Sequence, residues 1–161
     1  MARSETDRED LLREATALVE RVELRLTNRA EPIVIGFRRD GSASCFFGAE
    51  SVYQFNAAGE LRRAFVAGRL IKAEQGRLVG LTRHRTAGEV ALLRVELTDA
   101  EQVALLEQAR QELEELSTAL ESHSYKLIGQ VPAGEDIIGR IGRWLAARPK
   151  EIAIAARPNV R

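Results

Sequence analysis

Short apolar segments separated by glycine-containing turns fill residues 33–97. The segments are IVIGFRR, ASCFFG, SVYQFN, ELRRAFV, RLIKAE, RLVGLTRHR and EVALLRVEL. The spacing between the glycines of successive turns is close to the ~8–12 residues expected of sequential hairpins. Tight hairpin turns need positive φ, which glycine adopts without strain. Since no helix-length segment interrupts the run, parallel crossovers are excluded. We expect an antiparallel meander of six to eight strands.

Residues 98–122 carry a helical pattern. Thr98 and Glu101 have the spacing of a capping box. Apolar residues then recur at steps of three and four, at Leu106, Ala109, Leu113, Leu116 and Leu120. This stripe lies on one helical face and is too short for a coiled coil. The pattern predicts a helix that lies on the apolar face of the sheet.

The two ends of the chain add further elements. The N-terminal segment reads as a helix to about Val19, followed by a strand that begins near Val22. After Ser124, the pattern predicts a strand ended by Pro132, a helix ended by Pro149 and a short strand EIAIA. We therefore expect a single α+β domain over residues 1–161, with a sub-boundary near His123 as the alternative.

Composition narrows the protein class. Apolar residues make up 45% and charged residues 30% of the 161 residues, which is typical of a globular chain. No apolar run approaches the ~20 residues that span a bilayer, and the polar start MARSETDREDLL indicates no secretory signal. The single cysteine, Cys45, excludes an internal disulfide. These features predict a cytoplasmic protein with no membrane partner.

Charge is segregated along a chain whose net charge is zero. Residues 98–123 are strongly acidic, whereas residues 32–97 and 124–161 are each basic. Either the blocks pair inside the fold or across a dimer, or a basic face stays open for an anionic partner. Pairing is the interpretation we favour.

The cationic residues of the central segment form the candidate anion-binding set. They are Arg62, Arg63, Arg69, Lys72, Arg77, Arg83 and Arg85. If the side chains of residues 60–66 simply alternate, Arg63 and Phe65 share one face of the strand and Arg62 lies on the other face. A dedicated cationic platform would instead show arginine at every second position of adjacent strands. Most of these residues are therefore expected to line an ordinary solvated hairpin.

Aromatic residues could turn this surface into a nucleic-acid platform, because exposed rings stack on bases. Tyr53 and Phe55 share a face of one predicted strand, and Phe65 could neighbour them. A core position is the interpretation we favour for all three.

No arrangement of residues indicates catalysis, a metal or a cofactor. His84 and His123 lie on different elements and lack partners at metal-binding spacing. Cys45 reads as a small buried apolar residue. The glycines of Gly129–Gly134 have phosphate-loop spacing, but Glu135 and Asp136 follow where a lysine and a hydroxyl belong.

Ile137-Ile138-Gly139-Arg140-Ile141-Gly142 resembles the I-I-G-x-x-G stretch of KH nucleic-acid-binding domains. In that family the G-x-x-G loop clamps a nucleic-acid backbone. The resemblance covers about 30 residues. The same residues also fit one amphipathic helix in which Ile141 faces the core and the glycines permit close packing. We favour the helix.

The expected function is that of a non-catalytic binding or assembly protein, with a second copy or another protein as its partner. A nucleic-acid or phosphate-binding module that uses the cationic set is the first alternative. The second is an enzyme or small-ligand binder with a pocket between sheet and helix, near His84, Tyr53 or Arg63.

Overall fold

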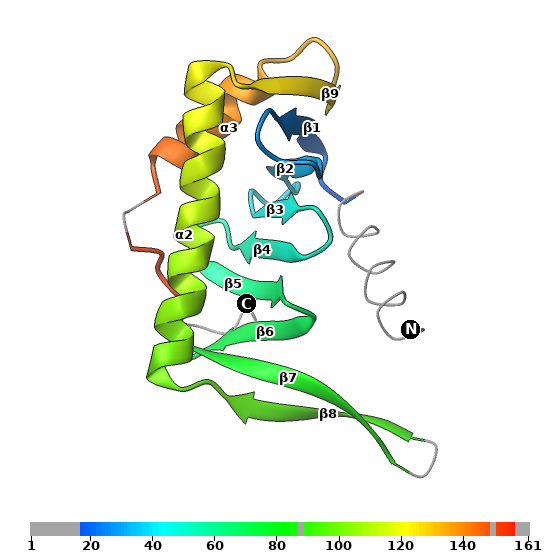
Figure 1. The fold of residues 1–161 in the computed structure, drawn as a ribbon, viewed down its shortest axis with the longest axis vertical. Coiled ribbons are helices and arrows are strands. Elements are labelled where there is room, and N and C mark those ends of the chain that lie inside the picture. The colour runs from blue at the N-terminus through cyan, green and yellow to red at the C-terminus, as the bar shows by residue number, and fades with distance from the viewer. Residues whose placement is uncertain (1–16, 87–88, 149–150, 157–161) are drawn as a thin grey trace.

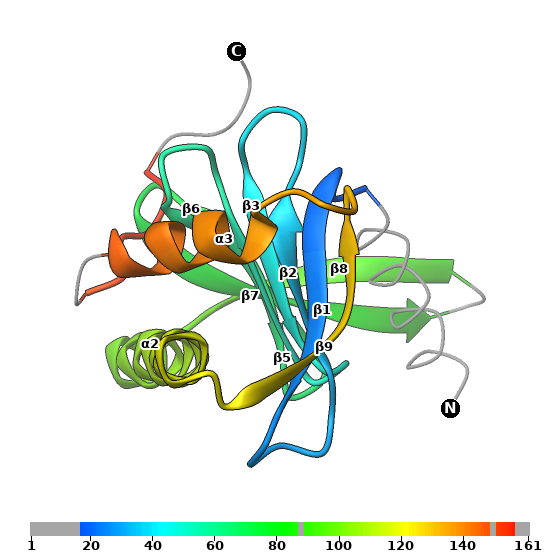
Figure 2. The ribbon, with the colours of Figure 1, turned by 90° about the horizontal axis from the view of Figure 1, so that it is seen from above.

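Within the residues that the structure describes, nine antiparallel strands form one open sheet, and two helices cover one of its faces. The computed structural model describes residues 17–86, 89–148 and 151–156, and the side chains of residues 83–92 are outside that description. The strand order is β8-β7-β6-β5-β4-β3-β2-β1-β9. β1 to β8 are thus a meander in chain order. Figure 1 shows α2 crossing the whole stack of strands, and Figure 2 shows α2 and α3 on the same side of the sheet.

The strands, in chain order, are β1 (Glu20–Leu26), β2 (Ile33–Phe37), β3 (Ala43–Phe47), β4 (Ser51–Phe55), β5 (Leu61–Val66), β6 (Arg69–Glu74), β7 (Arg77–Thr86), β8 (Glu89–Glu96) and β9 (Tyr125–Val131). The helices are α2 (Asp99–Ser122) and α3 (Ile137–Ala146). The meander from β2 to β8, followed by the long helix, fits the sequence prediction. The strand expected near Val22 begins at Glu20, and the predicted N-terminal helix lies largely outside the described residues.

Side chains alternate between the two faces of the sheet. The register places one row of buried residues side by side on the helix-covered face: Val22, Ile35, Cys45, Tyr53, Ala64 and Ile71. These residues and the buried stripe of α2 belong to one hydrophobic core. Such burial supplies most of the driving force for folding, at about 1.5–3 kcal/mol for a large aliphatic side chain.

α2 begins at a complete capping box. Thr98 accepts the N–H of Glu101, and the Glu101 side chain accepts the N–H of Thr98. The buried stripe contains Leu105 rather than Leu106, which is only partly buried. A fully buried polar contact accompanies this stripe, since Gln102 Oε1 accepts the N–H of Leu78 at 3.0 Å. The helix therefore contacts the sheet through its backbone as well as its core.

The turn before β5 forms as its sequence predicts. Gly59 has a φ of +84° and its N–H donates to the carbonyl of Asn56 at 2.9 Å. The Asn56 side chain accepts the N–H groups of Ala58 and Glu60. The pairing of β4 with β5 shifts by one residue immediately beyond this turn, between Gln54 and Phe55.

The opposite, open face of the sheet has a second small core. Leu18, Phe46 and Val52 are buried there, with Val34 and Phe65 packed against them. Tyr53 and Phe55 are core residues of the helix-covered face, as expected. The prediction that Phe65 neighbours them was wrong, because Phe65 pairs with Val52 and therefore points to the open face.

The C-terminal segment does not form a separate piece. β9 pairs with β1 and extends the main sheet, and the predicted last strand is reduced to a single parallel bridge between Leu61 and Ile154. Residues 137–146 form the helix α3, with Ile141 fully buried, so the helical interpretation of the KH-like stretch is confirmed.

Gly139 has a local role in α3 rather than the packing role that we expected. The Asp136 carboxylate accepts its N–H at 3.0 Å and caps the helix. A Cβ at Gly139 would lie 2.3 Å from that carboxylate, whereas the space beside Gly142 is open. Among the described residues, no helix is long and apolar enough to cross a membrane.

Candidate functional site

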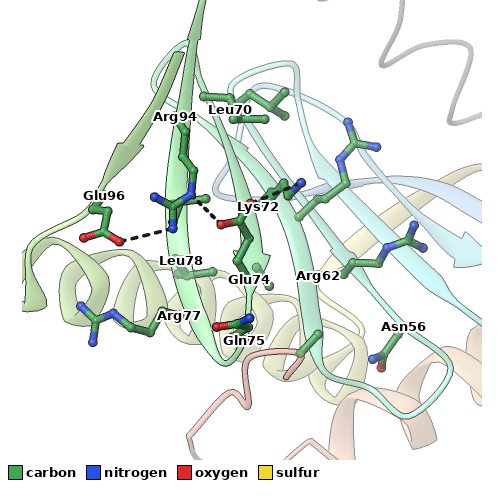
Figure 3. A pocket seen from close by; sticks show the side chains of 15 residues that line it. Asn56, Arg62, Leu70, Lys72, Glu74, Gln75, Arg77, Leu78, Arg94 and Glu96 are labelled. Carbon is green, nitrogen blue, oxygen red and sulfur yellow. Dashed lines mark hydrogen bonds and ion pairs between the residues drawn. The ribbon is translucent and has the colours of Figure 1, made fainter. Parts of the chain in front are cut away.

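A groove with a volume of about 830 Å³ lies over strands β5 to β8. Figure 3 shows its side chains in front of the strands, with α2 behind them. Most of its lining residues belong to the open face, where the register joins Arg63, Lys72, Val79 and Glu96 into one row. The groove is therefore on the side of the sheet opposite α2.

The floor of the groove is aliphatic. Leu70 pairs with Leu81, and Val79 lies beside them in the same strand as Leu81. None of the described residues that line the groove is aromatic. Leu70 and Leu81 are partly exposed and Val79 is buried. A partner would therefore meet the two leucines and no stacking platform.

Two consecutive arginines reach this groove because of the irregularity in β5. Phe55 pairs with Leu61 and Gln54 pairs with Arg63, so Arg62 is an extra residue with no partner on β4. A bulge of this kind changes the direction of the side chains around it. Leu61 is fully buried in the core of the helix-covered face, and both Arg62 and Arg63 line the groove. Simple alternation had separated these arginines, and that prediction was wrong.

Lys72 adds a third cation to the same wall. It lies on β6 directly opposite Arg63, at a Cα separation of about 5 Å. Its Nζ is 3.5 Å from Glu74 Oε2; the Lys72 side chain is exposed and the Glu74 side chain is partly exposed. Within the described residues, Arg62 is exposed and has no ion-pair partner.

The two carboxylates of the groove are held by Arg94, a residue that the sequence analysis did not select. Arg94 Nε donates to Glu74 Oε1 at 2.6 Å, and Arg94 Nη2 donates to Glu96 Oε1 at 3.3 Å (Figure 3). The hydrogen bond from Arg94 lowers the pKa of Glu74, which stays ionised. Five cationic and two acidic side chains line the groove, so its net charge is positive. The sequence signal that could have pointed to Arg94 was its position within one of the predicted strands.

Two other members of the predicted set pair with α2. Arg77, at the mouth of the groove, donates to Asp99 at 2.9 Å. Arg69 is on the helix-covered face, where its guanidinium passes over Gly80 and lies 3.6 Å from Glu101. These pairs are exposed and contribute little to stability. They show that the acidic first turn of α2 neutralises part of the basic segment, as the favoured interpretation of the charge pattern predicts.

The side chains of Arg83, Arg85 and His84 lie outside the described residues. His123 is exposed at the C-terminus of α2 and stacks on Tyr125 at 6.4 Å between ring centroids. Among the described residues, no group of three or more His, Cys, Asp or Glu side chains could hold a metal.

The interface between sheet and helix contains a polar contact. Tyr53 Oη donates to Glu112 Oε1 at 2.5 Å, and Arg29 lies 3.5 Å from the other oxygen of Glu112. Burial raises the pKa of the Tyr53 hydroxyl above its usual range, and burial also raises that of the Cys45 thiol. Both groups are therefore protonated at neutral pH, which does not favour either as a nucleophile.

Comparison of the chain with protein families, curated proteins and solved structures found no significant match. The functional inference therefore depends on the groove itself.

Proposed function

We propose that the protein is a non-catalytic binding protein that holds an acidic, partly apolar segment of a partner protein in the groove over β5 to β8. The observation that carries this proposal is the placement of Arg62, Arg63 and Lys72 around an aliphatic floor. Arginine suits bidentate contacts with carboxylates, and the floor suits the apolar side chains between them. A segment that alternates acidic and apolar residues would use both the cations and the aliphatic floor.

Charge favours an anionic partner. The acidic side chains of the groove, Glu74 and Glu96, are already held by Arg94. A partner's carboxylates can therefore approach Arg62 and Arg63, and can share Lys72 with Glu74, without displacing Arg94 from its acids. Complementary charge of this kind mainly increases the association rate and the specificity of a complex.

The nucleic-acid alternative has weaker support. Proteins that bind single strands usually combine cations with aromatic side chains on which the bases stack. The floor residues Leu70, Val79 and Leu81 offer no such stacking, and the KH-like stretch is a helix.

Fluorescence anisotropy distinguishes these partners. Three labelled probes of equal charge are compared at about 50 mM salt: a peptide of alternating Glu and Leu, a peptide of Glu alone and a single-stranded oligothymidylate. The proposal predicts that the Glu-Leu peptide binds most tightly, because only it uses both cations and floor, and that binding weakens as salt rises. Preference for the oligonucleotide would reassign the groove to nucleic acid, and a failure of all three probes to bind would overturn the proposal.

A further inference from the structure

The aliphatic floor of the groove continues across the open face into the second small core. The register joins one row of apolar residues on strands β2 to β7: Val34, Phe46, Val52, Phe65, Leu70 and Leu81. Phe46 and Val52 are buried, whereas Phe65, Leu70 and Leu81 are partly exposed. The row therefore runs from a covered end over β3 and β4 to a partly open end in the groove.

A second row, which is polar, lies beside the apolar row on the same face. The register places Gly36, Ser44, Gln54, Arg63 and Lys72 side by side on β2 to β6. Ser44 and Gln54 are buried, and Ser44 Oγ has no hydrogen-bond partner among the described residues. Polar side chains on the open face of an antiparallel sheet are usually solvated, and both helices lie on the other face (Figure 2). The burial of Ser44 and Gln54 therefore points to a further segment that covers this part of the face.

Leu18 shows where the chain joins this face. Its side chain is fully buried with Phe46 and Val52 in the second core. The next residue, Val19, donates its N–H to the carbonyl of Phe37 at 2.9 Å, immediately before β1 begins. The description of the chain starts at residue 17. Residues 1–16 are therefore connected to the fold at the covered end of the apolar row.

The sequence of residues 1–16 is complementary to the two rows. At helical spacing, Leu11 and Ala15 share a stripe with Leu18, and Asp10 and Glu14 lie along one side of that stripe. The segment thus places acidic residues beside apolar ones, as the open face places cations beside its apolar row. Seven residues of helix span about 10 Å, which is close to two strand spacings. A helix that leads away from Leu18 can therefore place Leu11 over β5 and β6.

We infer that residues 1–16 dock as a helix along the apolar row toward the groove, with Asp10 and Glu14 against Arg63 and Lys72. Charge sets this direction. The opposite direction leads to Glu23, which pairs with Val34 at the other end of the row and repels the acidic side of the segment. The docked segment supplies the cover that the burial of Ser44 requires.

Docking of this segment regulates the groove, a consequence that rests on the proposed function. Residues 1–16 are themselves acidic and partly apolar, so they compete with a partner of the same chemistry for Arg63 and Lys72. The competitor belongs to the same chain, so its effective concentration is high. If it occupies the cations about two thirds of the time, the affinity for a partner falls about threefold.

A zero-length crosslink tests the docking without any partner. A carbodiimide joins a lysine amine to a carboxylate in direct contact with it, and mass spectrometry of the tryptic peptides identifies the pair. Lys72 and Lys126 are matched, because both are exposed and lie on strands far apart in the sheet order. In the full chain we expect Lys72 to be joined to Asp10 or Glu14, and Lys126 to neither.

Anisotropy with the Glu-Leu peptide tests the competition. The double substitution Asp10→Asn with Glu14→Gln should increase the affinity about threefold. The control, Glu5→Gln with Glu9→Gln, removes the same charge from the opposite side of the predicted helix. It should leave the affinity unchanged, because glutamine also completes a capping box with Thr6. Far-UV circular dichroism establishes that each variant folds.

Three results would overturn the inference. They are a wild type in which Lys72 is never joined to residues 1–16, an affinity that the Asp10 and Glu14 substitutions leave unchanged, and an equal increase in the control. If the peptide binds to none of these proteins, the proposed function fails instead. The crosslink then decides alone whether the segment lies along the apolar row.

Discussion

Tyr53 and Glu112 join the middle of the sheet to the middle of the long helix through a 2.5 Å hydrogen bond. Tyr53 is fully buried on β4, and the Glu112 side chain is only 14% exposed. Arg29, which follows β1, lies 3.5 Å from Glu112 and 2.9 Å from Glu115. Each oxygen of the Glu112 carboxylate at the edge of the core thus has a partner, Tyr53 for one and Arg29 for the other. The contact fixes how the helix is positioned along the strands.

The Tyr53→Phe substitution tests that contact. It removes the hydroxyl but keeps the ring in the core, so Glu112 loses one of its partners at a partly buried position. We expect a loss of about 1–3 kcal/mol in the free energy of unfolding, measured by urea denaturation. Tyr125→Phe, on the edge strand β9, is the matched control and should change stability much less. Equal effects at both positions would contradict the assigned role of the hydrogen bond.

Alkaline pH tests the burial of Cys45 and Tyr53. Burial raises the pKa of both groups in the folded state above their ordinary values of 9.0 and 10.0. Below pH 9.0 both groups are protonated in both states and their stabilising effect is fully present. Above these values the unfolded chain releases protons that the folded chain retains, so stability falls as pH rises, by up to about 1.4 kcal/mol per pH unit for each group.

The measurement for this second prediction is the free energy of unfolding as a function of pH. Wild type should lose stability first above pH 9.0 and more steeply above pH 10.0. Cys45→Ala should remove the loss of stability that begins above pH 9.0. Tyr53→Phe should remove the steeper loss above pH 10.0. Slopes that are the same in all three proteins would show that these groups titrate as they do in the unfolded chain.

Packing of α2 against the sheet is tested by two substitutions on that helix. Leu116 is fully buried, whereas Val103 is 67% exposed. Leu116→Ala should destabilise the protein by about 2–5 kcal/mol, because it leaves a cavity in the shared core. Val103→Ala should change stability by less than about 0.5 kcal/mol. The single tryptophan, Trp144, packs on Phe37 and Phe55 of the sheet, so its fluorescence reports unfolding. Similar losses for both variants would argue against this packing.

Much of the architecture was predictable because its signals are local. Glycine-marked turns identified the meander, and the Thr98–Glu101 capping box marked the start of the long helix. The pairing of β9 with β1 was not predictable, since these strands are about a hundred residues apart and nothing in either sequence specifies its neighbour. Leu105 was missed because helical spacing alone does not distinguish it from Leu106.

The candidate site was harder to predict than the fold. Four members of the cationic set, Arg62, Arg63, Lys72 and Arg77, line the groove, while Arg69 is on the other face. The decisive feature is the extra residue in β5, because one inserted residue reverses the expected alternation. The sequence shows the turn at Asn56–Gly59 but not where the pairing shifts. Arg94 was missed because its partner acids come from two different strands.

The most direct test of the central claim compares Arg62→Ala with Arg63→Ala in binding of the Glu-Leu peptide. Because the bulge brings both guanidinium groups to the groove, each substitution should weaken binding by about tenfold. Arg25→Ala is the control. Arg25 is exposed on β1, which β2, β3 and β4 separate from β5, so this substitution should leave the affinity unchanged. If Arg63→Ala alone weakened binding, or if Arg25→Ala weakened it as much as either variant, the groove formed around the bulge would not be the binding site.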